Sequence, residues 1–108
     1  MLKWYSNLYI GDNAKKQAKN IIRKINTGAG QLDIYIITLA HNPENHLEII
    51  ASSSLLQKTV RQMCPMIVGI AKSREEALSL VTKITAEVYE KTNSANIRTF
   101  IKNHHDGA

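Results

Sequence analysis

Residues 32–40 read LDIYIITLA, and this stretch decides the fold. It is rich in β-branched residues and has almost no polar break, which is the pattern of a strand covered on both faces. A second strand, HLEIIAS (46–52), follows after the loop NPEN (42–45), whose proline suits the second position of a type I turn. The two segments predict a β-hairpin whose first strand is central in its sheet.

The segment before this hairpin, GDNAKKQAKNIIRKINTGAG (11–30), has the signals of a helix that starts at Asp12 and stops at Gly28. Its apolar residues recur at helical spacing on one side: Ala14, Ala18, Ile21, Ile22 and Ile25. The opposite side carries the cations: Lys15, Lys16, Lys19, Arg23 and Lys24. The pattern predicts an amphipathic helix with a cationic outer face.

After the hairpin, three serines predict the cap of a short helix, SLLQKTVRQM (54–63), which ends before Pro65. A strand, MIVGIA (66–71), comes next. Ser73 and Glu76 have the spacing of a capping box and open a long helix to about Lys91. NIRTFI (96–101) alternates apolar and polar residues, which favours a last short strand.

These elements predict an α/β protein with a small mixed four-stranded sheet flanked by helices, in the order α-β-β-α-β-α-β. Each strand-helix-strand step should be a parallel crossover, and only the hairpin should be antiparallel. A chain of 108 residues fits one domain, expected over 1–101, with 102–108 as a flexible tail. The aromatic residues Trp4, Tyr5 and Tyr9 are expected to pack the N-terminal segment onto the sheet.

The net charge of +5 is concentrated at one end of the chain. Residues 1–30 hold six Lys or Arg against one Asp, whereas residues 31–108 hold eight basic against eight acidic residues. Lys15, Lys19 and Arg23 are spaced so that their like charges repel, and a bound polyanion would relieve this repulsion. These three residues are therefore candidates for anion binding, although a solvated helix face that keeps the protein in solution has the same pattern.

The junction AKSRE (71–75) is a second candidate for anion binding, with Lys72, Ser73 and Arg74 as its residues. It lies where a strand meets the start of a helix, and exposed backbone amides at such a point can bind an anion. Against this interpretation, the capping box already uses these amides, and Glu75 would repel an anion.

The hairpin tip gives the sharpest chemical hypothesis. If a four-residue loop closes the hairpin, His41 lies opposite His46, and Glu48 shares their face. Two histidines and one carboxylate can hold a divalent metal, so His41, His46 and Glu48 form a candidate metal site. The hypothesis depends on the register, because a slip of one residue moves one strand's side chains to the other face. The alternative is that these residues are polar only because the hairpin tip is exposed to solvent.

The sequence contains no recognised catalytic motif, and no catalytic residue is assigned. Cys64 is the only cysteine and is expected to be a buried packing residue. An intrachain disulfide is impossible, which favours a reducing cytoplasm. No apolar run is long enough to span a bilayer, and the N-terminal residues do not have the pattern of a secretory signal.

The stretches YIITLAHNPENHLEII (35–50), NLYIGDNAKK (7–16) and MIVGIAKSREEAL (66–78) resemble small uncharacterised bacterial α/β proteins of about this length. The resemblance implies a bacterial cytoplasmic protein and carries no activity with it.

Taken together, these features favour a small binding or regulatory module for an anionic ligand over an enzyme. A homo-oligomer is expected, because small domains gain core by association and the last strand would lie at a sheet edge. Two alternatives remain open: a metal-dependent enzyme that uses the hairpin residues, and a nucleic-acid-binding protein that uses the basic helix.

Overall fold

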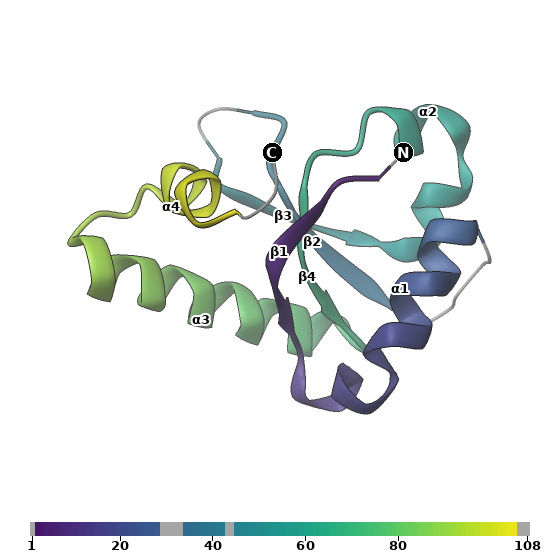
Figure 1. The fold of residues 1–108 in the computed structure, drawn as a ribbon, viewed down its shortest axis with the longest axis horizontal. Coiled ribbons are helices and arrows are strands. Elements are labelled where there is room, and N and C mark those ends of the chain that lie inside the picture. Colours follow the sequence, from purple (N-terminus) through teal and green to yellow (C-terminus); the bar gives the residue numbers. More distant parts are fainter. Residues whose placement is uncertain (1, 29–33, 43–44, 106–108) are drawn as a thin grey trace.

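The computed structural model describes residues 2–28, 34–42 and 45–105, and its centre is a mixed four-stranded sheet (Figure 1). The strands lie in the order β1-β4-β2-β3. Their bounds are β1 Trp4–Ile10, β2 Tyr35–Leu39, β3 Leu47–Ala51 and β4 Ile67–Ala71. Helices flank the sheet, so the predicted α/β class and the mixed four-stranded sheet are confirmed.

The helices cover both faces of the sheet. Two lie against one face, α1 (Ala18–Thr27) and α2 (Lys58–Gln62), and two against the other, α3 (Arg74–Thr92) and α4 (Ile97–His104) (Figure 1). Short 3₁₀ segments, η1 (Asp12–Gln17) and η2 (Ser52–Leu56), precede α1 and α2. In the described parts of the chain, no helix combines the length and the apolar character that crossing a bilayer requires.

Each face of the sheet has its own apolar core. Ile37, Val68, Leu80 and Ile84 belong to the core under α3 and α4, whereas Ile21, Ile36 and Ile70 belong to the core under η1, α1 and η2. All five residues of β4 are buried. Gly69 of β4 lets α3 approach closely, because a Cβ there would lie 3.2 Å from the side chain of Leu80. The central strands are therefore covered on both faces, as the sequence predicts for β2.

The N-terminal residues form a strand that the sequence analysis does not assign. β1 pairs in parallel with β4, with Trp4 opposite Ile67 and Tyr9 opposite Gly69. Its middle residues, Ser6 and Asn7, are exposed because β1 is an edge strand. A polar centre of this kind interrupts the apolar pattern that marks a strand, which explains why composition alone indicates only a packed aromatic segment.

The predicted last strand at 96–101 is wrong, because these residues begin helix α4. The side chain of Asn96 caps the helix by accepting a hydrogen bond from the Thr99 N–H at 3.2 Å. Ile97, Phe100 and Ile101 are buried at helical spacing. Six residues are too few to distinguish a period of 2 from one of 3.6. Helix α4 continues to His104, so the predicted tail from 102 starts inside it, and residues 106–108 lie outside the described part.

The strand directions also differ in part from the prediction. The hairpin of β2 and β3 is antiparallel as expected, but β2 is also antiparallel to β4. The parallel pair is β1 and β4. The step from β3 through α2 to β4 joins parallel strands that are separated by β2, so it is not a crossover between neighbours. The predicted element order holds from α1 to α3 and changes at the two ends of the chain.

Candidate functional site

A cavity of about 460 Å³ lies where the carboxyl ends of β1 and β4 meet the start of α3. This is the part of an open α/β sheet where ligands most often bind. Its lining includes three carboxylates, from Asp12, Glu75 and Glu76, and one cation, Lys83. The cavity is therefore more acidic than the junction sequence indicates, which disfavours an anion inside it.

Glu76 links the segments that follow β1 and β4 by hydrogen bonds. Its Oε1 accepts a hydrogen bond from the Lys72 N–H at 2.9 Å, and its Oε2 accepts one from the Asn13 N–H at 2.9 Å. The Ser73 Oγ accepts the Glu76 N–H at 3.0 Å, so one half of the predicted capping box is confirmed. Glu76 does not complete the box, because its carboxylate bonds Lys72 and Asn13. Gly11 makes this possible, since a Cβ there would overlap the Glu76 side chain.

One residue of the second predicted anion-binding group, Lys72, reaches the element that carries the first group. The Lys72 Nζ donates a hydrogen bond to the Gln17 Oε1 at 3.0 Å, although 55 residues separate them in the sequence. Gln17 is the last residue of η1, next to Lys16 and two residues before Lys19. We call this region, formed by Lys15, Lys16, Lys19, Arg23 and Lys72, the basic surface. Of the other predicted residues, Ser73 caps α3 and Arg74 is exposed at its first turn.

The cations of the basic surface have few acidic partners. Lys15 pairs with Asp12 at 3.0 Å, and both side chains are largely exposed. Arg23 donates a hydrogen bond to the Asn20 Oδ1 at 2.6 Å, a neutral partner. Within the described residues, no ion pair is formed by Lys16, Lys19 or Arg23.

The register assumed for the histidine hairpin is wrong by one residue. β2 and β3 pair with Thr38 opposite Glu48 and Leu39 opposite Leu47. The Ala40 N–H donates to the His46 carbonyl at 3.1 Å, so Ala40 and not His41 lies opposite His46. A slip of one residue moves His41 away from the face that His46 and Glu48 share.

The metal hypothesis therefore loses the geometry on which it depended. Over the residues that the structure describes, no group of three His, Cys, Asp or Glu side chains is placed to hold a metal ion. On the face that Thr38, His46 and Glu48 share, the buried Thr38 Oγ1 and His46 Nδ1 have no hydrogen-bond partner among the described residues.

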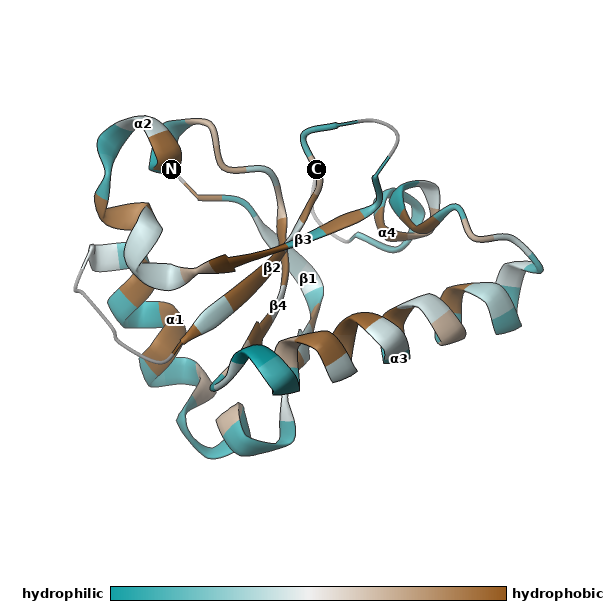
Figure 2. Ribbon diagram, turned by 180° about the vertical axis from the view of Figure 1, so that it is seen from behind, coloured by the Kyte–Doolittle hydropathy of each residue, from teal (hydrophilic) through white to brown (hydrophobic). Residues whose placement is uncertain are grey.

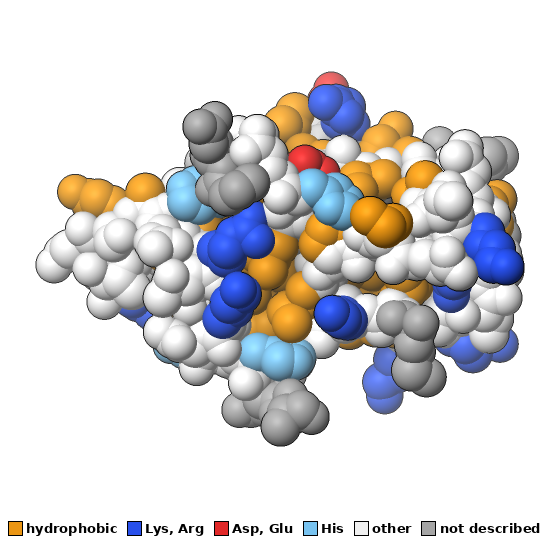
Figure 3. Space-filling view, turned by 90° about the horizontal axis from the view of Figure 1, so that it is seen from above, with side chains coloured by type: hydrophobic (Ala, Val, Ile, Leu, Met, Phe, Trp, Pro, Cys, Tyr) orange, Lys and Arg blue, Asp and Glu red, His pale blue; other side chains and the backbone are white. Residues whose placement is uncertain are grey.

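A second cavity, of about 430 Å³, lies between the hairpin and α2. It is mainly apolar, and its lining includes His41, Ile50, Met63 and Cys64. Figure 3 shows this end of the molecule, where hydrophobic side chains are visible between basic and histidine side chains. Cys64 is only half-buried, and this burial raises the pKa of its thiol while Arg61 opposes the rise. A protonated thiol is a poor nucleophile, which agrees with a packing role for Cys64.

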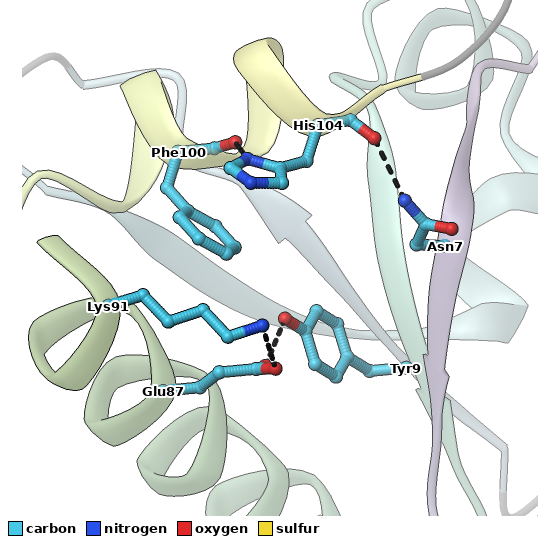
Figure 4. Close-up of polar contacts among 6 residues, drawn as sticks. All are labelled: Asn7, Tyr9, Glu87, Lys91, Phe100 and His104. Carbon is cyan, nitrogen blue, oxygen red and sulfur yellow. Dashed lines mark hydrogen bonds and ion pairs between the residues drawn. The ribbon is translucent and has the colours of Figure 1, made fainter.

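A polar cluster that the sequence does not reveal joins β1, α3 and α4 (Figure 4). The Tyr9 hydroxyl donates a short hydrogen bond to the Glu87 carboxylate, which also pairs with Lys91 at 3.4 Å. The Asn7 side-chain amide donates to the His104 carbonyl at 2.8 Å. No local signal could have identified this cluster, since 78 residues separate Tyr9 from Glu87.

The protonation states of this cluster indicate a structural role. Burial, together with the bond to Glu87, raises the pKa of Tyr9 well above the usual 10.0 of a phenol. The hydrogen bond from Tyr9 holds the pKa of Glu87 below its usual range, and Lys91 contributes in the same direction. Tyr9 stays protonated and Glu87 stays ionised near neutral pH, whereas an acid or base for catalysis needs a pKa near the working pH.

Replacement of Tyr9 by Phe is expected to lower the free energy of unfolding by about 1 kcal/mol at pH 7, the usual worth of one hydrogen bond. A carboxylate whose pKa is depressed by folding stabilises the fold above its unfolded pKa, and this contribution is lost as the pH falls through the folded pKa. The difference between wild type and variant should therefore shrink as the pH falls below the 4.5 typical of Glu.

Denaturant unfolding of both proteins at several pH values measures this effect. Tyr89→Phe is the matched control, because Tyr89 is 60% exposed on α3 and should contribute little. A difference between wild type and Tyr9→Phe that stays constant down to pH 3 would contradict the coupling of Tyr9 to an ionised Glu87.

The chain matches no protein-family model, and comparisons with curated proteins and with solved structures give no match either.

Proposed function

We propose that this protein is a cytoplasmic binding module for a phosphate-rich anionic ligand, which docks on the basic surface. The observation that carries the proposal is the contact between Lys72 and Gln17, since it joins the cation of the β4–α3 junction to those of η1 and α1. This contact supports treating Lys72 and the cations of η1 and α1 as one binding surface. The single cysteine, Cys64, is free, which fits a reducing compartment.

The electrostatics of η1 and α1 support a ligand of opposite charge. Lys19 and Arg23 lie four residues apart on the exposed side of α1, where like charges destabilise a helix by about 0.2 to 0.5 kcal/mol per pair. Asp12 is the only acidic residue between residues 1 and 30, and it lies at the start of η1. A bound polyanion would turn this repulsion into attraction.

A phosphate-rich ligand fits this surface better than a single small anion does. Four of the five cations are exposed and spread along η1 and α1, so they can contact several phosphates at once but do not enclose one. Surface contacts of this kind bind through the release of counterions, which makes the affinity strongly dependent on salt. The acidic cavity at the start of α3, with Glu75 and Glu76 in its lining, disfavours entry of an anionic ligand.

The test is the salt dependence of binding to a labelled single-stranded oligonucleotide, measured by fluorescence anisotropy. The triple variant Lys16→Gln, Lys19→Gln and Arg23→Gln should bind at least tenfold more weakly than wild type. Its slope of log K against log salt should be smaller by about 2, since each phosphate contact on a single strand contributes about 0.7.

A control variant removes the same charge elsewhere: Lys3→Gln, Lys91→Gln and Lys102→Gln, all exposed positions. It should keep most of the affinity and the slope. Titration with inorganic tripolyphosphate separates the ligand classes, because a module for a small ligand binds tripolyphosphate well and the oligonucleotide poorly. If neither probe binds at low salt, or if the two triple variants lose affinity equally, the proposal is wrong.

A further inference from the structure

Strand β3 presents an open edge of the sheet. It is the last strand in the order β1-β4-β2-β3, and β2 occupies only one of its sides. In the described part of the chain, no strand pairs with its other side. Figure 2 views the molecule from this side, with β3 crossing in front of the other strands and apolar bands of α3 below it. An edge of this kind is a template for pairing with another strand.

The opposite edge of the sheet, strand β1, is covered by the C-terminal end of α4 and by His105. The N–H of Ser6 in β1 donates to the His105 Nδ1 at 3.2 Å, and the Asn7 amide binds the His104 carbonyl. The pairing of β1 with β4 also shifts register between Trp4 and Tyr9. An irregular and covered edge resists pairing, whereas β3 has a regular ladder with β2 and contains neither proline nor lysine.

The hydrogen bonds of the hairpin show which backbone groups of β3 point outward. The His46 carbonyl accepts the Ala40 N–H, and the Ser52 N–H donates to the Ile34 carbonyl at 2.9 Å. In an antiparallel ladder the residues between alternate, so Glu48 and Ile50 also bond β2. Leu47, Ile49 and Ala51 therefore direct their N–H and C=O groups away from β2, to the open edge.

We propose that β3 pairs with β3 of a second copy of this chain, in antiparallel register about a twofold axis at Ile49. Each Ile49 then exchanges hydrogen bonds with Ile49 of the other copy, and Leu47 lies opposite Ala51. Every outward backbone group between 47 and 51 obtains a partner. Glu48 faces Ile50 of the other copy, so the only charge of the strand never opposes itself. This self-complementarity favours a second copy over an unrelated strand.

The flank of α3 beside β3 is suited to the same interface. Leu78 and Tyr89 are 50% and 60% exposed, and with the half-buried Val81 they form one stripe of the helix. Glu87 contacts β1 from the other side of α3, so this stripe lies toward β2 and β3. A twofold axis at Ile49 places the two α3 helices on the same face of a continuous sheet, with the stripes facing each other. The stripe contains no Lys or Arg, so like charges do not meet where the two stripes face each other.

Ala51→Pro tests the pairing without disturbing the hairpin. Ala51 has φ −65°, the value that proline requires, and its N–H points away from β2. The proline ring removes an outward donor and blocks close approach of a second strand. Glu48→Gln is the matched control on the same strand, since it leaves every backbone group of the open edge in place.

Sedimentation velocity over a range of concentrations should give wild type and Glu48→Gln a mass of twice 12.1 kDa, and Ala51→Pro a dimer dissociation constant raised by about tenfold or more. Circular dichroism of Ala51→Pro should match wild type. Hydrogen exchange supplies an independent readout, because the Ile49 amide should be protected in wild type only at concentrations where the dimer forms. A wild type that stays monomeric at millimolar concentration overturns the proposal, and so does a dimer in which the Ile49 amide exchanges freely.

Discussion

Replacement of Phe100 by Ala is expected to lower the free energy of unfolding by about 3 to 5 kcal/mol, the usual cost of removing a buried phenyl ring. Phe100 is 5% exposed in the core that α4 shares with α3 and the sheet. Its ring also stacks on His104, with centroids 4.1 Å apart. Urea unfolding of the full chain, followed by circular dichroism, measures the loss.

Thr99→Ala is the control for this experiment and decides between helix and strand. In α4, Thr99 is exposed next to the buried Phe100, so its replacement should change the free energy of unfolding by less than about 0.5 kcal/mol. In a strand, Thr99 would share a face with Ile97 and Ile101, opposite to Phe100. Comparable losses for the two variants would contradict the helix.

Replacement of Glu76 by Ala is expected to cost about 2 to 4 kcal/mol, because two backbone N–H groups lose a charged acceptor at once. These groups belong to Asn13 at the start of η1 and to Lys72 at the end of β4, so the loss detaches η1 from the β4–α3 junction. Glu75→Ala is the matched control, since Glu75 is exposed at the neighbouring position. Thermal and urea unfolding of both variants measure the difference.

Gly11→Ala is a second test of the hydrogen bonds from Asn13 and Lys72 to Glu76. The added Cβ would overlap the Glu76 side chain and push its carboxylate off both amides, so a similar loss is expected from a single methyl group. In a Glu76→Ala background the methyl group meets no carboxylate, and Gly11→Ala should then cost much less. Costs that simply add in the double variant would mean that the two residues do not interact.

The pairing register of the hairpin could not be predicted from the local sequence pattern. Both strands carry isoleucines on both faces: Ile36 lies opposite Ile50, and Ile37 lies opposite Ile49. The sequence pattern therefore does not indicate which face of each strand packs against which core. Two registers one residue apart then satisfy the pattern equally. Arg98 of α4 donates to the Ala40 carbonyl at 2.7 Å and contacts the loop at the Asn45 carbonyl, at 3.5 Å. The register is thus fixed in part by a residue 58 positions away from Ala40.

The sequence also predicts only a part of the basic surface. The sequence predicts the cationic side of η1 and α1, because the apolar residues Ala18, Ile21 and Ile25 recur at helical spacing and leave the cations outside. It also identifies Lys72 as a separate candidate. The contact between Lys72 and Gln17 cannot be read from the sequence, because it requires the end of β4 to lie beside η1, and the parallel pairing of β1 with β4 decides this.

The sequence by itself determined the elements from α1 to α3, the burial of β2, and the concentration of positive charge at one end of the chain. These features follow from residue periodicity and composition, which act over a few positions. The tertiary structure decided the order of the strands, the inclusion of β1 in the sheet, the helical state of 97–104 and the hairpin register. In each of these cases short segments have weak preferences of their own, and packing against residues far away in the chain selects among them.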